Sequence, residues 1–310
     1  MNNAPTVSRS AVVAGAAGAV GGATCRELVR RGWRVFGGVR SEAAAERLDQ
    51  AEGRIVPVAF DVTDEASLAA AAERVELELG GSGLHGLVNA VGIVVRGPLE
   101  LVPLSALRRQ FEVNVFGHVA VVQAFLPALR RGRGRIVNVG AASGRVTIPF
   151  LGAISASKTA LESITDALRM ELKHFGIAVS LVDPSHLYTG IFAKADAAAA
   201  RDGYAGTPAV LDLYGPALQA TREAIAKQKR NPVEKAVTPI VKALTERRPR
   251  TRYLAGRDAH LLEMVRHLPD GVRDRMLMSS MGMKKDLFVT PTTSRDSEPS
   301  ALGRAVQRPD

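Results

Sequence analysis

Short apolar runs alternate with longer helix-like segments over residues 10–182, and this alternation restricts the possible fold more than any other feature of the sequence. The apolar runs, which we expect to be strands, are residues 10–14, 33–39, 54–60, 84–91, 135–139 and 177–182. The helix-like segments between them are residues 24–31, 66–79, 104–129 and 155–175. Strands that are apolar along their whole length are typical of a parallel sheet covered by helices on both faces. The sequence therefore predicts an α/β fold with a single doubly wound parallel sheet.

The pattern changes after Asp183-Pro184. The next segment, residues 186–230, is partly rich in alanine, and we expect it to form a helical lid over a cleft. A further helix over residues 232–244 and a last strand over residues 252–254 follow. The end of the chain carries Thr, Ser, Pro and Asp with little apolar periodicity, which favours a frayed tail. We thus expect an N-terminal tail (1–9), one domain (10–285) and a flexible C-terminal tail (286–310).

Most of the positive charge lies in one segment. The whole chain has 41 Lys and Arg against 31 Asp and Glu, and residues 222–285 alone hold 16 against 7. Such a segment is either a solvated basic face or a patch that attracts an anionic partner, such as a phosphate-bearing substrate or an acidic carrier protein. We find no nucleic-acid-binding module and few aromatic residues for base stacking in this segment, so we expect no nucleic-acid partner.

Cysteine content and hydropathy indicate where such a chain would reside. The single cysteine, Cys25, excludes an intramolecular disulfide framework and fits the reducing cytoplasm. The chain has no run of 18 apolar residues, so we expect no membrane span. We also predict no metal site.

A glycine-rich turn follows the first predicted strand. Its glycines are Gly15, Gly18 and Gly21, within the segment from Ala14 to Gly21. Glycine lets the backbone turn tightly and approach a pyrophosphate, and the N-terminus of the next helix offers free N–H groups to the phosphates. The position between a strand and a helix favours a Rossmann-type dinucleotide site.

The end of the second strand distinguishes NADP from NAD. An acidic residue there would bind the adenosine 2′-hydroxyl of NAD, but the strand ends with Val39 and Arg40. The Arg40 guanidinium suits a 2′-phosphate, so we favour NADP(H) over NAD(H). Glu42 leaves NAD(H) open, since its carboxylate could reach back to the ribose.

Several ordered motifs resemble the short-chain dehydrogenase/reductase family, in particular its steroid, retinol and polyketide ketoreductase branch, over roughly residues 10–275. They are the glycine turn, Asp61-Val62, Asn89-Ala90-Val91-Gly92, Asn114, residues 135–139 and residues 184–189. The resemblance and the glycine turn together imply a cofactor site made of Gly15, Ala17, Gly18, Val20, Gly21, Arg40, Asp61, Val62, Asn89, Ala90, Val91, Gly92, Lys158, Pro184, Leu187 and Thr189.

The resemblance fails at the chemical centre. The family places a Tyr four residues before a Lys, so that both lie on one helix face, and a Ser thirteen residues before that Tyr. Residues 155–160 fix Lys158 as the family lysine, which puts Ile154 at the Tyr position and Ala141 at the Ser position. Asn114 and Lys158 of the family tetrad remain.

Three hypotheses follow from these replacements. The first is an atypical NADP(H)-dependent ketoreductase that obtains its proton from the substrate, from water or from a substitute residue. The second is a non-redox cyclase, isomerase or dehydratase, and the third is a catalytically inactive nucleotide-binding subunit. For the first we assign Asn114, Lys158, Tyr188 and Ser143 to catalysis, with His186 and Ser155 as further possible donors. Ala141, Ile154 and His186 are assigned to the substrate pocket.

The expected substrate and oligomer also follow from the resemblance. The alanine content of the lid segment indicates a roomy apolar pocket, suited to a polycyclic or aromatic ketone such as those of polyketide antibiotic biosynthesis. In the family, the helices corresponding to residues 104–129 and 155–175 commonly form a dimer interface. We therefore expect a homodimer, whose outer helix faces include Val122 and Phe125.

Overall fold

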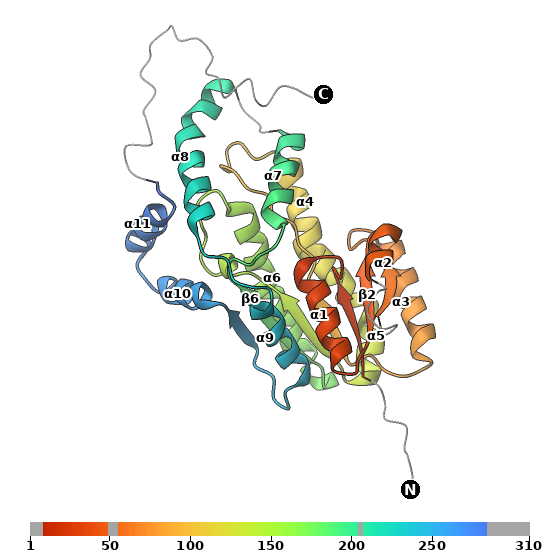
Figure 1. Cartoon of the computed structure of the whole chain (residues 1–310). Coiled ribbons are helices and arrows are strands. Elements are labelled where there is room, and N and C mark those ends of the chain that lie inside the picture. The colour runs from red at the N-terminus through yellow and green to blue at the C-terminus, as the bar shows by residue number, and fades with distance from the viewer. Residues whose placement is uncertain (1–8, 49–54, 204–206, 284–310) are drawn as a thin grey trace.

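A computed structural model of the chain describes residues 9–48, 55–203 and 207–283 (Figure 1). It contains one parallel sheet with the strand order β3-β2-β1-β4-β5-β6-β7. The strands are β1 (Ser10–Ala14), β2 (Arg34–Val39), β3 (Ile55–Ala59), β4 (Gly86–Asn89), β5 (Arg135–Val139), β6 (Ala178–Pro184) and β7 (Arg252–Ala255). The order reverses direction between β1 and β4, which is the arrangement of a doubly wound fold. The predicted fold class is confirmed.

Helices cover both faces of the sheet. One layer contains α1 (Ala19–Arg30), α2 (Glu42–Leu48) and α9 (Glu234–Thr245); the other contains α3 (Glu65–Leu79), α5 (Gly117–Gly132) and part of α6 (Gly152–Glu171). Neighbouring strand residues enter opposite layers: Val13 and Val88 pack in the first, Val12 and Leu87 in the second. This two-sided burial is the reason why the strands are apolar along their whole length.

Cys25 belongs to the first layer. Its side chain is fully buried on α1, and burial raises the pKa of the thiol to about 12. The same helix begins at Ala19, five residues before the predicted start at Thr24. Helix propensity disfavours the glycines of this first turn, and tertiary contacts of α1 with α9 and β2 override that preference.

The predicted helix over residues 104–129 contains a π-helical turn. It consists of α4 (Leu104–Phe111), the turn η1 (Glu112–Phe116) and α5. Such turns occur mostly at functional sites, and this one carries Asn114. By length and composition the continuous segment from Leu104 to Gly132 could cross a membrane, but half of its most apolar window is buried inside the protein, as in a core helix.

The segment predicted as a lid holds two helices, α7 (Ile191–Asp202) and α8 (Pro208–Lys227). Figure 1 shows both extending beyond the same end of the sheet. Polar contacts connect them to the rest of the chain: Arg96 with Asp196 at 3.3 Å, Arg109 with Asp202, and the Tyr214 hydroxyl donating to Glu100 at 2.7 Å.

Two helices near the C-terminus were not predicted, α10 (Arg257–Val265) and α11 (Asp270–Ser280). The short helix α2 was also missed. The predicted C-terminal tail and, apart from Arg9, the predicted N-terminal tail lie outside the described residues. The expected outer-face residues Val122 and Phe125 are buried in the core, because α5 turns this side toward α3 and the sheet.

Candidate functional site

A cavity of about 500 Å³ lies at the carboxyl ends of the central strands. Its walls come from the segments that follow β4, β5 and β6, from α1 and α6, and from α7, α8, α10 and α11. Ligands of open parallel sheets bind at this edge, where the strand order reverses. Most of its lining side chains are apolar.

The glycine turn lies beside this cavity and has the geometry of a pyrophosphate site. Gly15 has a φ of +83°, and a Cβ there would come within 3.0 Å of the Ala90 carbonyl group. Gly18 is the N-cap of α1 without a side-chain cap, so the first N–H groups of the helix are available to an anion. Ala17 is exposed beside it, Gly21 is buried in the first helical turn, and Val20 lines the cavity.

Arg40 and Asp61 form the adenosine end of the predicted cofactor site. Arg40 directly follows β2 and its side chain is 76% exposed, with a guanidinium nitrogen 4.0 Å from the Asp61 carboxylate. Burial alone would raise the pKa of Asp61, but hydrogen bonds from Thr63 and the charge of Arg40 lower it overall. The Val62 side chain is buried against Gly117 of α5 and so anchors the loop that carries Asp61.

The Asn89 side chain connects core elements of the protein. Its side chain is buried, and its amide donates to the Asn138 side chain at 3.0 Å and to the His118 carbonyl at 3.3 Å. These bonds connect β4 to β5 and α5. The residues that follow it, Ala90, Val91 and Gly92, line the cavity.

The side chains of Asn114 and Lys158 both lie close to Gly92. A Cβ on Gly92 would lie 3.6 Å from the side-chain oxygen Oδ1 of Asn114 and 3.8 Å from Lys158 Nζ. Asn114 is fixed by Ile93, whose N–H donates to Oδ1 at 2.9 Å and whose carbonyl accepts from Nδ2 at 3.0 Å. The Lys158 ammonium donates to the Val139 carbonyl at 2.7 Å. Burial lowers the pKa of Lys158 to about 8, although Asp183 acts in the opposite direction.

A buried histidine that the sequence did not indicate lies nearby. His118 on α5 has its Nε2 2.9 Å from the Val91 carbonyl, so the ring donates there. Burial, with the charge of Lys158, lowers the pKa of His118 to about 3. The ring is therefore neutral and holds the cavity floor in place.

The two replaced positions lie in this cavity. Ala141 and Ile154 both line it, and Ile154 packs with Val94 and Leu151 while only 7% exposed. Ser143, in the short 3-10 helix η2 (Ala142–Gly144), also lines it. Ser155 is buried, and its hydroxyl has no hydrogen-bond partner among the described residues.

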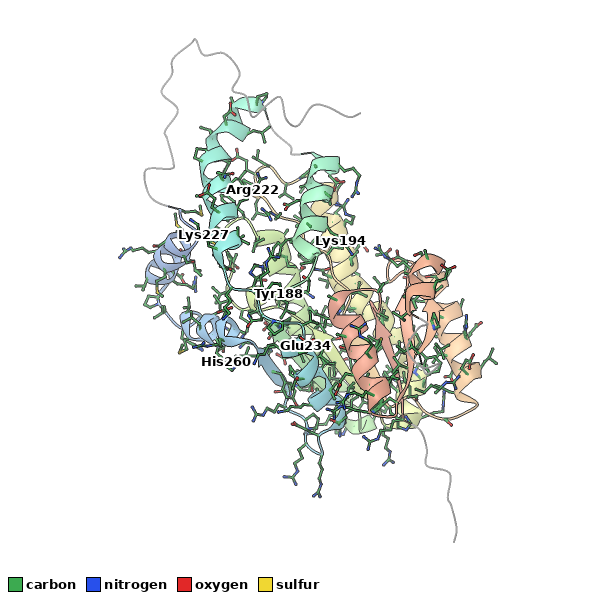
Figure 2. The ribbon with its side chains drawn as sticks, in the orientation of Figure 1. Tyr188, Lys194, Arg222, Lys227, Glu234 and His260 are labelled. Carbon is green, nitrogen blue, oxygen red and sulfur yellow. The ribbon has the colours of Figure 1, made fainter. Side chains whose placement is uncertain are left out.

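The last residue of β6, Pro184, lies in the cavity wall, and the loop that follows contributes His186, Leu187 and Thr189. Both His186 ring nitrogens are buried with no hydrogen-bond partner in the described part of the chain. The ring lies edge-on to Phe192 at 5.3 Å, and burial lowers the pKa of His186. Tyr188, which is labelled in Figure 2, is 60% exposed and is not among the described residues that line the cavity.

Asn231 secures this loop and was missed from the sequence, where Asn231-Pro232 indicates only a turn. Its side-chain amide donates to Ser185 Oγ at 3.0 Å and to the His186 carbonyl at 3.3 Å. Its backbone N–H donates to the same carbonyl at 2.7 Å, and its own carbonyl accepts from Tyr188 N–H at 2.8 Å. One residue just after the segment predicted as a lid thus fixes the loop that carries the predicted cofactor-binding residues Leu187 and Thr189.

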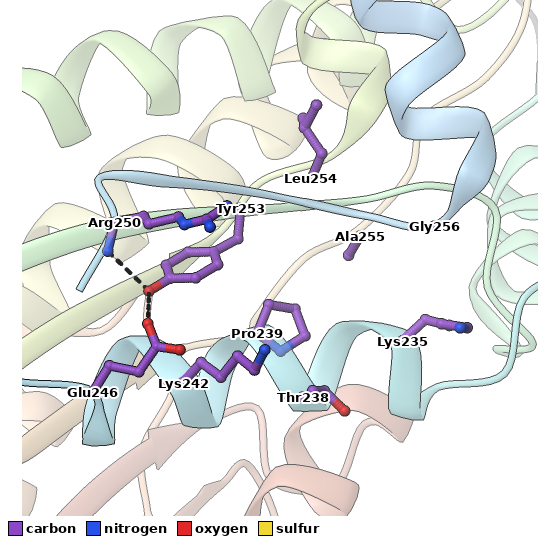
Figure 3. Close-up of a pocket in the computed structure, with 10 residues that line it drawn as sticks. All are labelled: Lys235, Thr238, Pro239, Lys242, Glu246, Arg250, Tyr253, Leu254, Ala255 and Gly256. Atoms are coloured by element: carbon purple, nitrogen blue, oxygen red, sulfur yellow. Dashed lines mark hydrogen bonds between the residues drawn. The ribbon is translucent and has the colours of Figure 1, made fainter. Parts of the chain in front are cut away.

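A second hollow of about 370 Å³ lies between α9 and β7 (Figure 3). Within it, the Tyr253 hydroxyl accepts from Arg250 N–H at 2.9 Å and donates to Glu246 at 3.2 Å. These bonds stabilise the turn before β7. None of the predicted site residues lines this hollow, so the candidate site is the cavity at the carboxyl ends of the strands.

Known proteins resemble this chain over most of its length. An NADPH-dependent 3-dehydrocapnine reductase of Ornithobacterium rhinotracheale is 30% identical over 282 residues, which cover 88% of this chain and 97% of that protein. A 17-beta-hydroxysteroid dehydrogenase type 6 of Bos taurus is 36% identical over 270 residues, covering 84% of each. Retinol dehydrogenase 16 of Mus musculus is 34% identical over 261 residues, covering 81% of this chain and 82% of that protein.

Solved structures share the fold. A short-chain dehydrogenase from Streptomyces avermitilis superposes with a TM-score of 0.71 at 29% identity, covering 87% of this chain and 94% of that one. A short chain dehydrogenase from Burkholderia cenocepacia in complex with NADP superposes with a TM-score of 0.69 at 26% identity, covering 87% and 98%. The family model described as short chain dehydrogenase matches residues 9–200. The chain therefore belongs to the short-chain dehydrogenase/reductase family of oxidoreductases.

Proposed function

We propose that the protein is an atypical NADP(H)-dependent ketoreductase acting on a bulky apolar ketone or alcohol of secondary metabolism. The observation that carries the proposal is the cavity of about 500 Å³, whose mostly apolar wall includes the cofactor-loop residues Gly92 and Thr189 together with Lys158. A large apolar substrate and a nicotinamide would meet there. Arg40 at the adenosine end, and the NADP held by the Burkholderia cenocepacia structure, support the choice of NADP(H).

The residues present fit such a cofactor. Gly18 leaves the first N–H groups of α1 to a pyrophosphate, Arg40 suits the 2′-phosphate, and Lys158 and Thr189 suit the nicotinamide end. When bound, the nicotinamide supplies the hydride for the carbonyl carbon. The Lys158 ammonium lines the cavity and would stabilise the oxyanion that develops, and Asn114 fixes the loop after β4 through Ile93.

The proton is the atypical part of the proposed reaction. Ala141 and Ile154 offer no proton, so we assign the donor to the substrate's own hydroxyl, to water beside Lys158, or to Ser143. Ser143 is a better candidate than Tyr188, because Ser143 lines the cavity and Tyr188 is largely exposed. A positioned acid contributes about 10²–10⁴-fold to such a rate, so the reaction without one is slow or limited to substrates that protonate themselves.

Transfer of deuterium tests this function. The purified protein is incubated with NADPH carrying deuterium at its transferable position and a panel of polycyclic and aryl ketones, and the products are analysed by mass spectrometry. We expect deuterium at the new carbinol carbon and loss of activity in Lys158→Met. Tight NADPH binding without transfer to any carbonyl contradicts the proposal and favours an inactive nucleotide-binding subunit. Product formation that does not depend on the nucleotide favours a cyclase, isomerase or dehydratase.

We further propose a cytoplasmic homodimer. Support comes from large apolar side chains on the outer surfaces of the α4–α5 and α6 helices: Leu104 is 65%, Phe116 57% and Met170 61% exposed. An acidic carrier protein is a second proposed partner, supported by the excess of Lys and Arg in residues 222–285. Pull-down with an acidic acyl carrier protein at low and high salt tests this contact, and salt-independent or absent binding contradicts it.

A further inference from the structure

The side chain of Asp183 is a buried carboxylate close to the proposed active site. It lies near the end of β6, is fully buried, and neither of its oxygens has a hydrogen-bond partner among the described residues. Its nearest cation is Arg145, with a guanidinium nitrogen 3.6 Å from Oδ2. Burying a carboxylate without hydrogen bonds is costly, so the charge of Asp183 needs positive charges nearby to stabilise it.

The carboxyl group lies directly behind the wall of the cavity. A Cβ on Gly140 would come within 2.1 Å of Asp183 Oδ1, so the carboxyl occupies the space that a larger residue would need. Gly140 lines the cavity, and so does the preceding residue, Val139. The Lys158 ammonium donates to the Val139 carbonyl at 2.7 Å. The ammonium and the carboxyl are therefore held against the same short backbone segment.

The other cations around Asp183 are shared with further carboxylates. Arg145 also contacts Glu162 of α6 at 3.6 Å and forms an ion pair with Glu263 of α10. Arg252 of β7 pairs with Glu162 at 2.8 Å and with Asp166 at 2.5 Å. The charge of Asp183 favours the ammonium form of Lys158 and raises its pKa.

We propose that Asp183 is a positioning residue that keeps Lys158 in its ammonium form inside the apolar site. The proposal rests on the proposed function, because it takes the ammonium as the form that holds the cofactor and stabilises the oxyanion. Burial lowers the pKa of Lys158, and the Asp183 carboxylate raises it. The pKa of Asp183 is itself raised by burial and by Glu162, against the opposing effects of Arg145, Arg252 and Lys158. Without the carboxylate, Lys158 loses its proton at a lower pH.

The test is the pH dependence of NADPH binding in Asp183→Asn, a substitution that nearly conserves shape and removes the charge. NADPH fluorescence is titrated with wild-type protein and variant between pH 6 and 10. We expect the alkaline loss of binding to move down by about one pH unit in the variant, since an opposite charge at close range shifts a pKa by roughly 1–3 units. At pH 8.5 the variant then binds NADPH about tenfold more weakly, with near-equal affinity at pH 6.5.

Asp166→Asn is the matched control, because it removes a carboxylate from the same ion network at Arg252. Its loss of NADPH binding at alkaline pH should occur at the same pH as in the wild type. The proposal is overturned if Asp183→Asn loses NADPH binding at the same pH as the wild type, or if both variants lose it at an equally lowered pH. Since binding is the readout, a protein that reduces no ketone still decides the question.

A measurement on the unaltered protein covers the case in which Asp183→Asn does not fold. With ¹³C-labelled lysine, the Lys158 Cε resonance is assigned by its absence in Lys158→Met and followed against pH. Coupling to Asp183 predicts two inflections, one for each group. A single inflection at the ordinary lysine pKa, roughly 10.4, overturns the proposal.

Discussion

In the proposed function, Arg40 selects NADP(H) over NAD(H). It directly follows β2, close to Asp61, and its guanidinium is largely exposed. A charge-assisted hydrogen bond contributes about 1.5–3 kcal/mol, and exposure puts this one at the lower end. We expect Arg40→Ala to weaken NADPH binding about tenfold and to leave NADH binding within about twofold. Isothermal titration with both nucleotides measures this.

The control for Arg40 is Arg31→Ala, which removes one positive charge at the far end of α1, where Arg31 is paired with Glu27. It should leave both affinities unchanged. Equal losses for NADPH and NADH in Arg40→Ala would show that Arg40 acts on the whole binding surface and does not select the 2′-phosphate.

Ile154 decides whether missing acid catalysis limits the proposed reaction. If the substrate protonates itself, Ile154→Tyr should change kcat less than about threefold and raise KM, because the larger ring overpacks the cluster of Val94 and Leu151. Steady-state rates of ketone reduction provide the measurement. An increase of kcat near a hundredfold would show instead that the missing tyrosine hydroxyl limits the rate.

Single residues were predictable where a local motif fixes their position. The segments around Gly15, Asp61 and Lys158 contain such motifs. The structure places Lys158 in the cavity wall, Gly15 against Ala90 of the same wall, and Asp61 beside Arg40. Asp183 and Asn231 were not predictable as site residues, because their partners are distant in sequence. Asn231 contacts Ser185 from 46 positions away. Tyr188 lies in the same motif as Thr189, but its side chain is 60% exposed and does not line the cavity, which the motif alone does not indicate.

At the scale of elements, the end of the lid and the loop after β6 form one unit through Asn231. Asn231→Ala removes three amide contacts, to Ser185 Oγ, to the His186 carbonyl and to Asp258, but retains the backbone bonds. We expect faster hydrogen exchange in residues 185–190 and a KM for NADPH raised about tenfold, with a loss of about 1–2 kcal/mol of local stability. Hydrogen-exchange mass spectrometry reports the first effect and steady-state kinetics the second.

Gln219→Ala serves as the comparison, because the Gln219 amide bonds only to Glu223 within the exposed face of α8. Hydrogen exchange in residues 185–190 of Gln219→Ala should match that of the wild type. Unchanged exchange in Asn231→Ala would mean that the backbone bonds alone hold the loop.

Element boundaries were predicted well for buried strands and poorly for exposed helices. The strands β1 and β5 agree with the apolar runs because both sheet faces are covered. The helices α10 and α11 expose apolar residues, including Leu261 and Met264, so their apolar pattern has no clear one-sided period. The π turn η1 leaves no hydropathy signal, since it shifts the helix by a single residue.

At the scale of the whole molecule, the proposed homodimer depends on the exposed apolar side chains of the α4–α5 and α6 helices. We expect the wild type to sediment as a dimer at micromolar concentration, and Phe116→Glu combined with Met170→Glu to sediment as a monomer with little change in melting temperature. Analytical ultracentrifugation measures both. Leu77→Glu on α3, where the side chain is 83% exposed, is the matched control and should remain dimeric. A monomeric wild type contradicts the prediction.

The single cysteine gives the molecule a further use. Cys25 is the one thiol of the chain, and its burial on α1 with a pKa raised to about 12 keeps it unreactive in the folded state. A cysteine introduced at an exposed position of α8, such as Leu213, would therefore take a fluorophore or spin label with almost no background. Lid movement could be followed by spectroscopy in an otherwise natural sequence, while slow labelling of Cys25 would time the opening of the nucleotide-binding half.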